Sequence, residues 1–316
     1  ASLGAAPGGV DREALFRWKH LANPFGRSIA FVADLDGEIV GLRTFMRWRF
    51  ARSGGGGEVL AVRAVDTATS PLVQRRGVFS RLTTRALDAA ESEGVAFVFN
   101  TPNDKSLPGY LKLGWHRLAD RKLRARVRRP DRLIRAAASR DLASGAATAP
   151  PPGSKLVPAE AFFSDPASVA PFAPAQPAPG KLSTPRWEGY LRWRYLAGPL
   201  PYVGLAEGSP PAAVAIVRLR NRGSLREALV CEAVCEPGAE RALRRLLARV
   251  PSAAGADHAV THVDEGWPAA GVLSRGGYLP LPRVGMHFVV RTVSPTRPDP
   301  LEDASWGLTL GDLELF

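Results

Sequence analysis

The chain carries one pattern of apolar and polar residues twice. In each copy, three apolar runs typical of β-strands precede an amphipathic helix and a fourth strand-like run. In the first copy these elements cover residues 28–33, 39–48, 59–65, 78–93 and 95–100. In the second copy they cover residues 202–206, 212–219, 225–234, 239–250 and 258–263. A repeat of about 165 residues is too long for a solenoid, so we expect two α/β domains with mixed (α+β) sheets.

The helix predicted over residues 78–93 is the clearest single element. Its apolar residues recur at a spacing of three and four and share one face, which holds Phe79, Leu82, Ala86, Leu87 and Ala90. Gly94 follows and favours the end of the helix at that point. We therefore expect one face of this helix to pack on a sheet.

A stretch rich in Pro and Ala separates the two copies. Proline lacks an N–H donor and restricts φ, so such a stretch resists helix and sheet. We expect an N-terminal domain over residues 1–145, a connector over 146–184 and a C-terminal domain with its tail over 185–316. Trp18 and Trp193 open the two copies at equivalent positions, and we expect both to be core or interdomain anchors.

The positive charge of the chain lies in its first half. The formal net charge is +12, and residues 1–140 alone hold 25 basic and 13 acidic residues. Within them, residues 117–140 hold ten basic residues and two acidic ones. Such an asymmetry indicates an anionic partner near the first domain, with a solvated surface as the plain alternative.

Several classes of protein are excluded by composition. With 45% hydrophobic and 23% charged residues the chain is not globally disordered. No apolar run approaches the roughly 20 residues of a membrane helix, so we expect no membrane contact. Two cysteines cannot form a disulfide framework, which favours a cytoplasmic protein. His258 and His262 lack the spacing of a metal site, and we expect no metal.

A strand, a turn that contains glycine, and a helix follow one another between residues 59 and 93. The turn and the start of the helix read Gln74, Arg75, Arg76, Gly77, Val78 and Phe79. Free N–H groups at the start of a helix bind phosphate, and two arginines add positive charge. On its own the pattern is common, and a plain connection is the alternative.

The segment after the next strand adds a second motif. Asn103 precedes Tyr110 by seven residues, and Leu113-Gly114-Trp115 follows. Together with residues 74–79, this order resembles the GCN5-related N-acetyltransferase (GNAT) superfamily, whose acetyl-CoA motif is Arg/Gln-x-x-Gly-x-Gly/Ala. The resemblance covers residues 11–130 well and 185–292 as a degenerate copy. It implies two tandem GNAT-like domains.

The resemblance implies transfer of an acyl group, in the first place acetyl, from acetyl-CoA to the amine of a small molecule. Tyr110 would be the general acid that protonates the leaving thiolate. The strand edge would pair with the pantetheine arm and the turn would hold the pyrophosphate. The implied contacts are Thr67, Ala68, Thr69, Gln74, Arg75, Arg76, Gly77, Val78, Phe79 and Asn103.

A base must also take a proton from the amine. Asp66, late in the central strand, is the first candidate, with a structural carboxylate as the alternative. Asn100, at the end of the next strand, could position the acceptor or a water molecule. The C-terminal carboxylate of Phe316 could also reach back into the site.

The second copy lacks the motif residues. Glu236 and Glu240 stand where the basic turn should be, and Leu273 stands in the place of Tyr110. We expect the second domain to be catalytically silent and to form a wall of the acceptor pocket. In the first copy, Gln74 and Phe79 depart from the commoner residues of the family, which leaves the identity of the acyl donor open.

The basic cluster supports an alternative donor. Its candidate contacts are Arg121, Lys122, Arg124, Arg126, Arg128 and Arg129. They could reach the 3′-phosphate of CoA, or they could bind tRNA. Some acyltransferases with paired GNAT-like domains take the acyl group from aminoacyl-tRNA, and that reaction is the alternative function. A binding module without catalytic activity is a further alternative from a different class.

Overall fold

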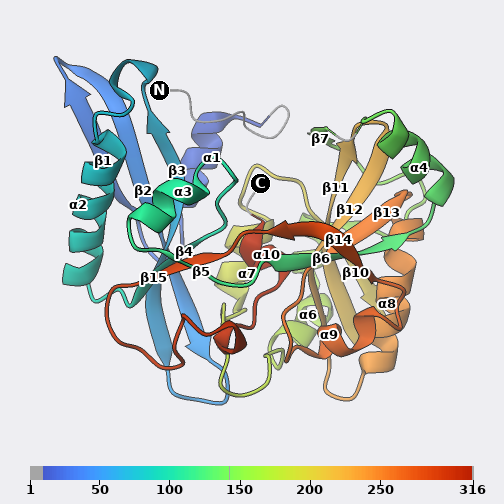
Figure 1. Cartoon of the computed structure of the whole chain (residues 1–316). Coiled ribbons are helices and arrows are strands. Elements are labelled where there is room, and N and C mark those ends of the chain that lie inside the picture. The colour runs from blue at the N-terminus through green and yellow to red at the C-terminus, as the bar shows by residue number, and fades with distance from the viewer. Residues whose placement is uncertain (1–9, 142, 315–316) are drawn as a thin grey trace.

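The computed structural model describes residues 10–141 and 143–314 and contains two β-sheets that lie side by side (Figure 1). The first has the order β1-β2-β3-β4-β15-β5, with bounds Ile29–Leu35, Glu38–Arg52, Glu58–Thr69, Phe97–Asn100, Val289–Thr292 and His116–Arg117. The second has the order β14-β6-β13-β12-β11-β10-β8, with bounds Leu279–Met286, Arg121–Val127, His258–Thr261, Leu225–Cys235, Ala213–Arg222, Val203–Glu207 and Val157–Pro158. The predicted mixed α/β fold is confirmed.

Helices cover the outer sides of both sheets. α2 (Val78–Ser92) lies on the first sheet and buries the apolar face predicted for it, whereas α8 (Glu240–Ala253) lies on the second (Figure 1). Further helices are α1 (Arg12–His20), α3 (Leu107–Lys112), α4 (Pro130–Ala138), α5 (Ala159–Ser164), α6 (Pro166–Val169), α7 (Glu188–Tyr195), α9 (Pro268–Leu273) and α10 (Leu310–Leu313). Among the described residues, no helix is long and apolar enough to cross a membrane.

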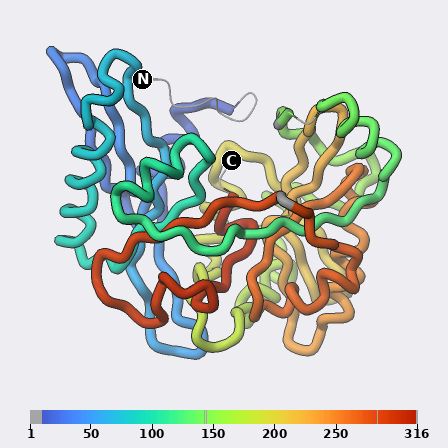
Figure 2. Tube along the Cα trace, viewed as in Figure 1, coloured from blue at the N-terminus to red at the C-terminus, as the bar shows by residue number. Residues whose placement is uncertain are grey.

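The two halves of the chain exchange one strand each. β6, from the first half, lies between β13 and β14 of the second sheet, and β15, from the second half, lies between β4 and β5 of the first. The crossing segments run next to one another through the middle of the molecule (Figure 2). The last strand of each repeat therefore completes the other half's sheet. Val289 and Val290 of β15 are fully buried there, so neither sheet is complete without both halves.

Apart from this exchange, the two sheets repeat one topology. The order β1-β2-β3-β4-β15-β5 matches β10-β11-β12-β13-β6-β14, and in both only the third and fourth strands are parallel. Three short strands lie outside this pattern: β9 (Leu182–Ser183) pairs with β2, β7 (Ser144–Ala147) pairs with β11, and β8 pairs with β10. In each sheet the two parallel strands pair over only a few residues and then separate.

Trp18 on α1 and Trp193 on α7 join the halves. Their rings stack at a centroid distance of 5.0 Å, and each indole N–H donates to the other residue's backbone carbonyl, at 2.7 and 3.0 Å. Both are buried in a core cluster that spans the two sheets, which confirms their prediction as core and interdomain anchors. The Pro- and Ala-rich stretch contributes β8, α5, α6 and β9, and it buries Phe162 and Phe163 in the same core.

Candidate active site

β3 leads through a 3₁₀ turn, η1 (Pro71–Val73), into the N-terminus of α2. Residues 74–77 are exposed, and Arg75 and Gly77 adopt φ values of 63° and 74°. Among the described residues, and apart from Gly77 and its two chain neighbours, no atom lies within 4 Å of the position that a Cβ would take at Gly77. The first N–H groups of α2 have no partner inside the helix, and its dipole is positive at this end. The turn is therefore open and chemically suited to a phosphate group.

Val78 and Phe79 pack inward from this turn. The Phe79 ring meets the Tyr110 ring edge-on, with centroids 5.9 Å apart. Val78 is buried so close to β2 that a Cβ at Gly41 would lie 2.7 Å from it. Glycine at position 41 thus lets α2 approach the sheet. The large side chain at position 79, which departs from the family motif, packs in the domain's interior.

β3 and β4 are parallel but pair only over residues 61–63 and 97–99. Beyond them, β3 continues to Thr69, and within residues 10–141 and 143–314 no strand pairs with this edge. Asp66 has a φ of 46° and lies in a bulge that shifts the register against β2. An extended ligand can pair its own amides with an open strand edge, which is the role predicted for residues 67–69.

Tyr110 lies on α3 beside this bulge. Its side chain is buried, and its hydroxyl oxygen accepts a hydrogen bond of 2.9 Å from Nη1 of Arg43. The same nitrogen donates to Oγ1 of Thr67 at 2.5 Å, which ties the phenol to β3. Because the phenol oxygen is the acceptor in this bond, its own proton is available to another group.

Arg43, on β2, is completely buried, and it forms no ion pair with the residues that the structure describes. The rings of Phe45, Phe79 and Tyr110 surround its guanidinium at centroid distances of 4.8, 5.3 and 5.2 Å. Its Nε and Nη2 atoms make no hydrogen bond, and among the described residues no carboxylate lies within ion-pair distance. Aromatic faces therefore stabilise this charge. A fixed cation here would stabilise negative charge on the phenol oxygen.

Asp66 is held by two residues of α1. Its carboxylate forms an ion pair with Lys19 and a hydrogen bond of 2.7 Å with Nε2 of His20. Burial raises the pKa of Asp66, but the His20 bond and the Lys19 charge outweigh it, so the pKa lies below its ordinary value. A carboxylate stabilised in this way is a weak base. Nδ1 of His20 contacts the hydroxyl oxygen of Ser28 at 2.8 Å.

The two predicted asparagines occupy different environments. Asn100 ends β4 and is buried, and its Oδ1 atom makes no hydrogen bond within the described part of the chain. Oδ1 of Asn103 accepts a hydrogen bond of 3.0 Å from the backbone N–H of Ser106 and so shapes the turn before α3. Asn100 thus offers an unused acceptor, whereas Asn103 stabilises a local turn.

Residues 6–118 match the family model of the acetyltransferase (GNAT) domain, a range that contains the turn, the bulge and Tyr110. The chain contains a GNAT acetyltransferase domain. It is an enzyme of the GNAT type. None of the curated proteins compared with the chain matches it.

Solved structures share the fold of most of the chain. A probable N-acyltransferase from Enterococcus faecalis V583 matches with a TM-score of 0.59 and 14% identity, over 91% of this chain and 66% of that one. Eis1 from Mycobacterium abscessus matches with a TM-score of 0.51 and 17% identity, over 92% and 68%. A GCN5-related N-acetyltransferase from Anabaena variabilis ATCC 29413 matches with a TM-score of 0.54 and 12% identity, over 95% and 78%. The chain thus spans about two thirds of the length of the first two proteins.

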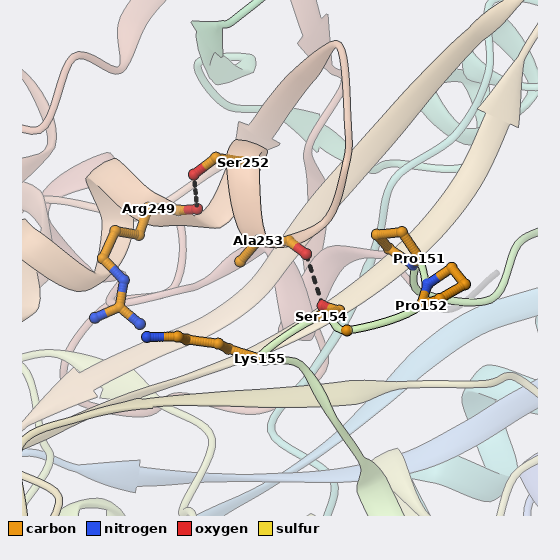
Figure 3. A pocket seen from close by; sticks show the side chains of 8 residues that line it. Pro151, Pro152, Ser154, Lys155, Arg249, Ser252 and Ala253 are labelled. Carbon is orange, nitrogen blue, oxygen red and sulfur yellow. Dashed lines mark hydrogen bonds between the residues drawn. The ribbon is translucent and has the colours of Figure 1, made fainter.

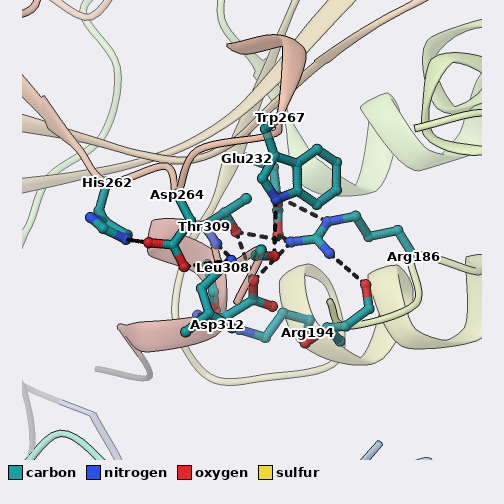
Figure 4. A network of polar contacts seen from close by, with 12 residues as sticks. Arg186, Arg194, Glu232, His262, Asp264, Trp267, Leu308, Thr309 and Asp312 are labelled. Atoms are coloured by element: carbon teal, nitrogen blue, oxygen red, sulfur yellow. Dashed lines mark hydrogen bonds and ion pairs between the residues drawn. The ribbon is translucent and has the colours of Figure 1, made fainter. Parts of the chain in front are cut away.

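In the second sheet the two parallel strands also separate beyond their paired stretch, but residues of the C-terminal tail lie between them. β12 and β13 pair over residues 227–230 and 258–261, and residues 308–313 of the tail lie beyond them. Arg186 holds this tail by donating to Oδ2 of Asp312 at 3.0 Å and to both carboxylate oxygens of Glu232 (Figure 4). Gly311 lies so close to β12 that a Cβ there would be 2.6 Å from Oε1 of Glu232.

The tail also reaches the GNAT domain. Arg63 of β3 donates to the backbone carbonyls of Asp312, at 2.6 Å, and of Leu313. Arg194 donates to the backbone carbonyl of Glu314, and Arg218 forms an ion pair with its side chain. The last described residues therefore lie between the two sheets. Phe316, whose carboxylate is a candidate base, lies outside the described residues.

The basic cluster is largely bound within the chain. β6, which carries much of it, is an internal strand of the second sheet. Arg121 is buried between Asp264 and Asp303, which lie on the other half of the chain. Other arginines of the cluster, which donate hydrogen bonds to nearby residues, are Arg124, Arg126, Arg128 and Arg129. Lys122 is exposed. Of these residues, Arg121 and Arg129 pair with carboxylates, whereas Arg124, Arg126 and Arg128 donate to uncharged oxygen atoms.

A hollow of about 380 Å³ lies on the second half of the chain (Figure 3). Residues 151–155 and the C-terminal end of α8 line it, and the side chains of Lys155 and Arg249 point toward one another. Arg249 forms an ion pair with Glu207. No residue of the predicted site lines this hollow.

The structure shows three further residues at the site that the sequence motifs do not identify: Arg43, His20 and Ser28. Arg43 stands out in the sequence as an arginine inside a predicted apolar strand, and this signal could have identified it. His20 lies 46 positions from Asp66 and Ser28 opens a predicted strand, and neither belongs to a motif. Only the packing of α1 against the bulge of β3 brings these two residues to Asp66.

Proposed function

We propose that the protein transfers an acyl group, acetyl in the simplest case, from acyl-CoA to the amine of a small molecule. The observation that carries the proposal is the Tyr110 hydroxyl, which Arg43 holds beside the open edge of β3. The exposed turn before α2 adds support, because Gly77 leaves space where a pyrophosphate would lie. The match to the GNAT domain model supports acyl-CoA as the class of donor.

Each group of residues has a distinct task in this reaction. Acyl-CoA supplies a thioester that an amine can attack. The turn at residues 74–77 binds its pyrophosphate, and the edge of β3 at residues 67–69 orients its pantetheine arm. Tyr110 gives its proton to the sulfur as the carbon–sulfur bond breaks, and Arg43 stabilises the phenolate that is left. Alignment of the two reactants contributes the rest.

We also infer that the second sheet is a degenerate copy of the first, without a donor site of its own. The shared strand order supports a common origin. Glu236 and Glu240 would repel a phosphate at the equivalent turn, and the tail occupies the divergence between β12 and β13. We assign this half two structural tasks: it holds the tail and forms one wall of the acceptor site.

The test is product formation by the purified full chain. Acetyl-CoA and n-propylamine are supplied, and release of the CoA thiol and formation of N-propylacetamide are followed by mass spectrometry. The proposal predicts both products in equal amounts. If the chain neither binds acetyl-CoA at millimolar concentration nor forms the amide, the proposal is wrong. Binding of tRNA with a steep salt dependence, without binding of acetyl-CoA, would instead support the aminoacyl-tRNA donor.

A further inference from the structure

The reaction needs a group that takes a proton from the amine, because an alkylamine is an ammonium ion at neutral pH and cannot attack. Asp66 is poorly suited to this task, since its carboxylate is already bound by Lys19 and His20. The same contacts, however, connect Asp66 through an imidazole to a hydroxyl group. This chain of three side chains is the feature that the proposed reaction has not yet used.

Ser28, His20 and Asp66 form a continuous hydrogen-bonded chain. Oγ of Ser28 lies 2.8 Å from Nδ1 of His20, and Nε2 of His20 lies 2.7 Å from Oδ2 of Asp66. His20 is 2% exposed, and its two ring nitrogens contact Ser28 and Asp66, so a proton reaches it through one of these residues, and Asp66 is already bound by Lys19. Ser28 is half-buried. Hydroxyl, imidazole and carboxylate in this order make a group that can pass a proton inward.

The relay lies on the opposite side of β3 from Tyr110. α1, which binds Asp66, packs with Trp18 in the core cluster between the two sheets, whereas Tyr110 packs in the cluster under α2. Asp66 contacts α1, which faces the second half of the chain through the stacked pair Trp18 and Trp193. Thr67 is bound by Arg43, which also holds Tyr110. A reacting thioester at this bulge would have a proton donor on one side and a proton acceptor on the other.

We propose that Ser28, His20 and Asp66 form a proton relay that deprotonates the acceptor amine. The inference rests on the proposed function. The ammonium gives a proton to Oγ of Ser28 while the hydroxyl proton of Ser28 moves to Nδ1 of His20, which leaves a neutral amine and an imidazolium held by Asp66. The amine then forms the carbon–nitrogen bond, the carbon–sulfur bond breaks, and the sulfur takes its proton from Tyr110. The nitrogen, which still carries one proton more than the amide, gives that proton through solvent to the Tyr110 phenolate, and His20 releases the first proton to solvent.

The first test needs no substrate. The relay requires that Nδ1 of His20 carries no proton and that Nε2 donates to Asp66. Nitrogen-15 NMR of the full chain, labelled at histidine and assigned with His20→Gln, reports this tautomer. The relay predicts that Nδ1 carries no proton and that its nitrogen-15 chemical shift changes in Ser28→Ala. A proton on Nδ1 would overturn it, because Ser28 could then not pass its own proton inward.

The second test compares two acceptors that differ in their protonation state. n-Propylamine must lose a proton before it attacks, whereas hydroxylamine is already neutral at the same pH. Ser28→Ala should lower kcat about 100-fold with n-propylamine and by less than about threefold with hydroxylamine, with KM for acetyl-CoA unchanged. Ser28→Ala combined with His20→Gln should lose no more than either change alone, since both break one relay. Ser92→Ala and His116→Gln, at exposed positions, are the matched controls.

The outcomes separate the relay from the proposed function. Equal losses with both acceptors, or no loss in Ser28→Ala, would overturn the relay while acyl transfer itself stands. An acyl group found on Ser28 by mass spectrometry would also overturn it, because Ser28 would then be a nucleophile. If the wild-type chain forms no amide from n-propylamine and no hydroxamate from hydroxylamine, the proposed function fails and the relay fails with it.

Discussion

The two sheets share a topology but use their central divergence in opposite ways. In the first sheet, β3 runs on past β4 as an open edge, beside an exposed turn and the Arg43–Tyr110 pair. In the second sheet, the tail fills the same space and is held by a buried network around Arg186. One local feature, the divergence of two parallel strands, can therefore support a binding edge or a packed core.

Each of the two places where parallel strands separate contains a buried arginine, and the two arginines differ in their partners. Arg43 is buried without a carboxylate partner among the described residues, and two of its nitrogen atoms make no hydrogen bond. Arg186 is equally buried, but it donates to Glu232, Asp312 and Thr309. A buried cation without a carboxylate partner is costly and indicates a functional position, whereas a buried cation paired with two carboxylates indicates a structural one. Four experiments test whether the first of these places is functional and the second structural.

The largest effect is expected at Tyr110. Tyr110→Phe removes the proton donor and should lower kcat about 100- to 10,000-fold with acetyl-CoA, with little change in circular dichroism. The matched control is Tyr278→Phe in the second half, whose hydroxyl donates to the Leu247 carbonyl in the core. It should cost about 1 kcal/mol of stability and leave kcat unchanged. Equal activities of the two variants would remove Tyr110 from the mechanism.

Arg186→Met should have the largest effect on stability. It leaves Glu232 and Asp312 buried without their cation, which costs about 3–5 kcal/mol in the free energy of unfolding. The same substitution at exposed Arg75 should leave stability unchanged and weaken acetyl-CoA binding instead. Urea unfolding and calorimetry measure the two quantities. A small stability loss in Arg186→Met would show that the tail is not anchored by this network.

A pH effect should come from Glu227 in the second sheet. Burial raises the pKa of Glu227, but the bond to His258 and the charge of Arg220 lower it to about 2. A folded-state pKa below the unfolded value stabilises the protein above about pH 4.5, and this contribution is lost as the pH falls toward 2. Glu227→Gln should therefore flatten the loss of stability over this range, followed by urea midpoints. Glu58→Gln, at an exposed position, is the control, and an unchanged slope in Glu227→Gln would contradict the assignment.

The smallest effect is expected from a pair of matched glycines. Gly77 and Gly238 precede α2 and α8, have φ values of 74° and 81°, and have open space at the position that a methyl group would take. Alanine at either position should cost about 1–2 kcal/mol of stability, because both conformations are left-handed. Only Gly77→Ala should also weaken acetyl-CoA binding, by about tenfold, since its methyl group would lie where the phosphate approaches. Equal affinities would contradict the placement of the pyrophosphate at this turn.

The sequence predicts the elements of this protein better than their connections. α2 begins at the predicted residue and buries the predicted face because its apolar spacing is a local property. The exchange of β6 and β15 could not be predicted, because a strand's partner depends on contacts far away in the sequence. Each last strand is consistent with either sheet, and only the packing of the crossing segments decides between them.

The candidate site shows the same limit. Tyr110 and the turn at residues 74–77 could be predicted because motif spacing carries them. The position of Asp66 in its strand makes it a candidate base, but its ion pair with Lys19 and its bond to His20 depend on how α1 packs. The excess of basic residues indicated an anionic partner, yet five arginines of the cluster bind other residues of the chain. Composition gives the sign of a charge and not the group that neutralises it.

The most direct test of the central claim is the number of acetyl-CoA molecules that one chain binds. Isothermal titration calorimetry of the full chain should give one site, weakened by Gly77→Ala and unchanged by Gly238→Ala. That result would show that the open divergence of the first sheet binds the donor and the filled divergence of the second does not. Two sites per chain, one site that only Gly238→Ala weakens, or no binding at millimolar ligand would contradict the account.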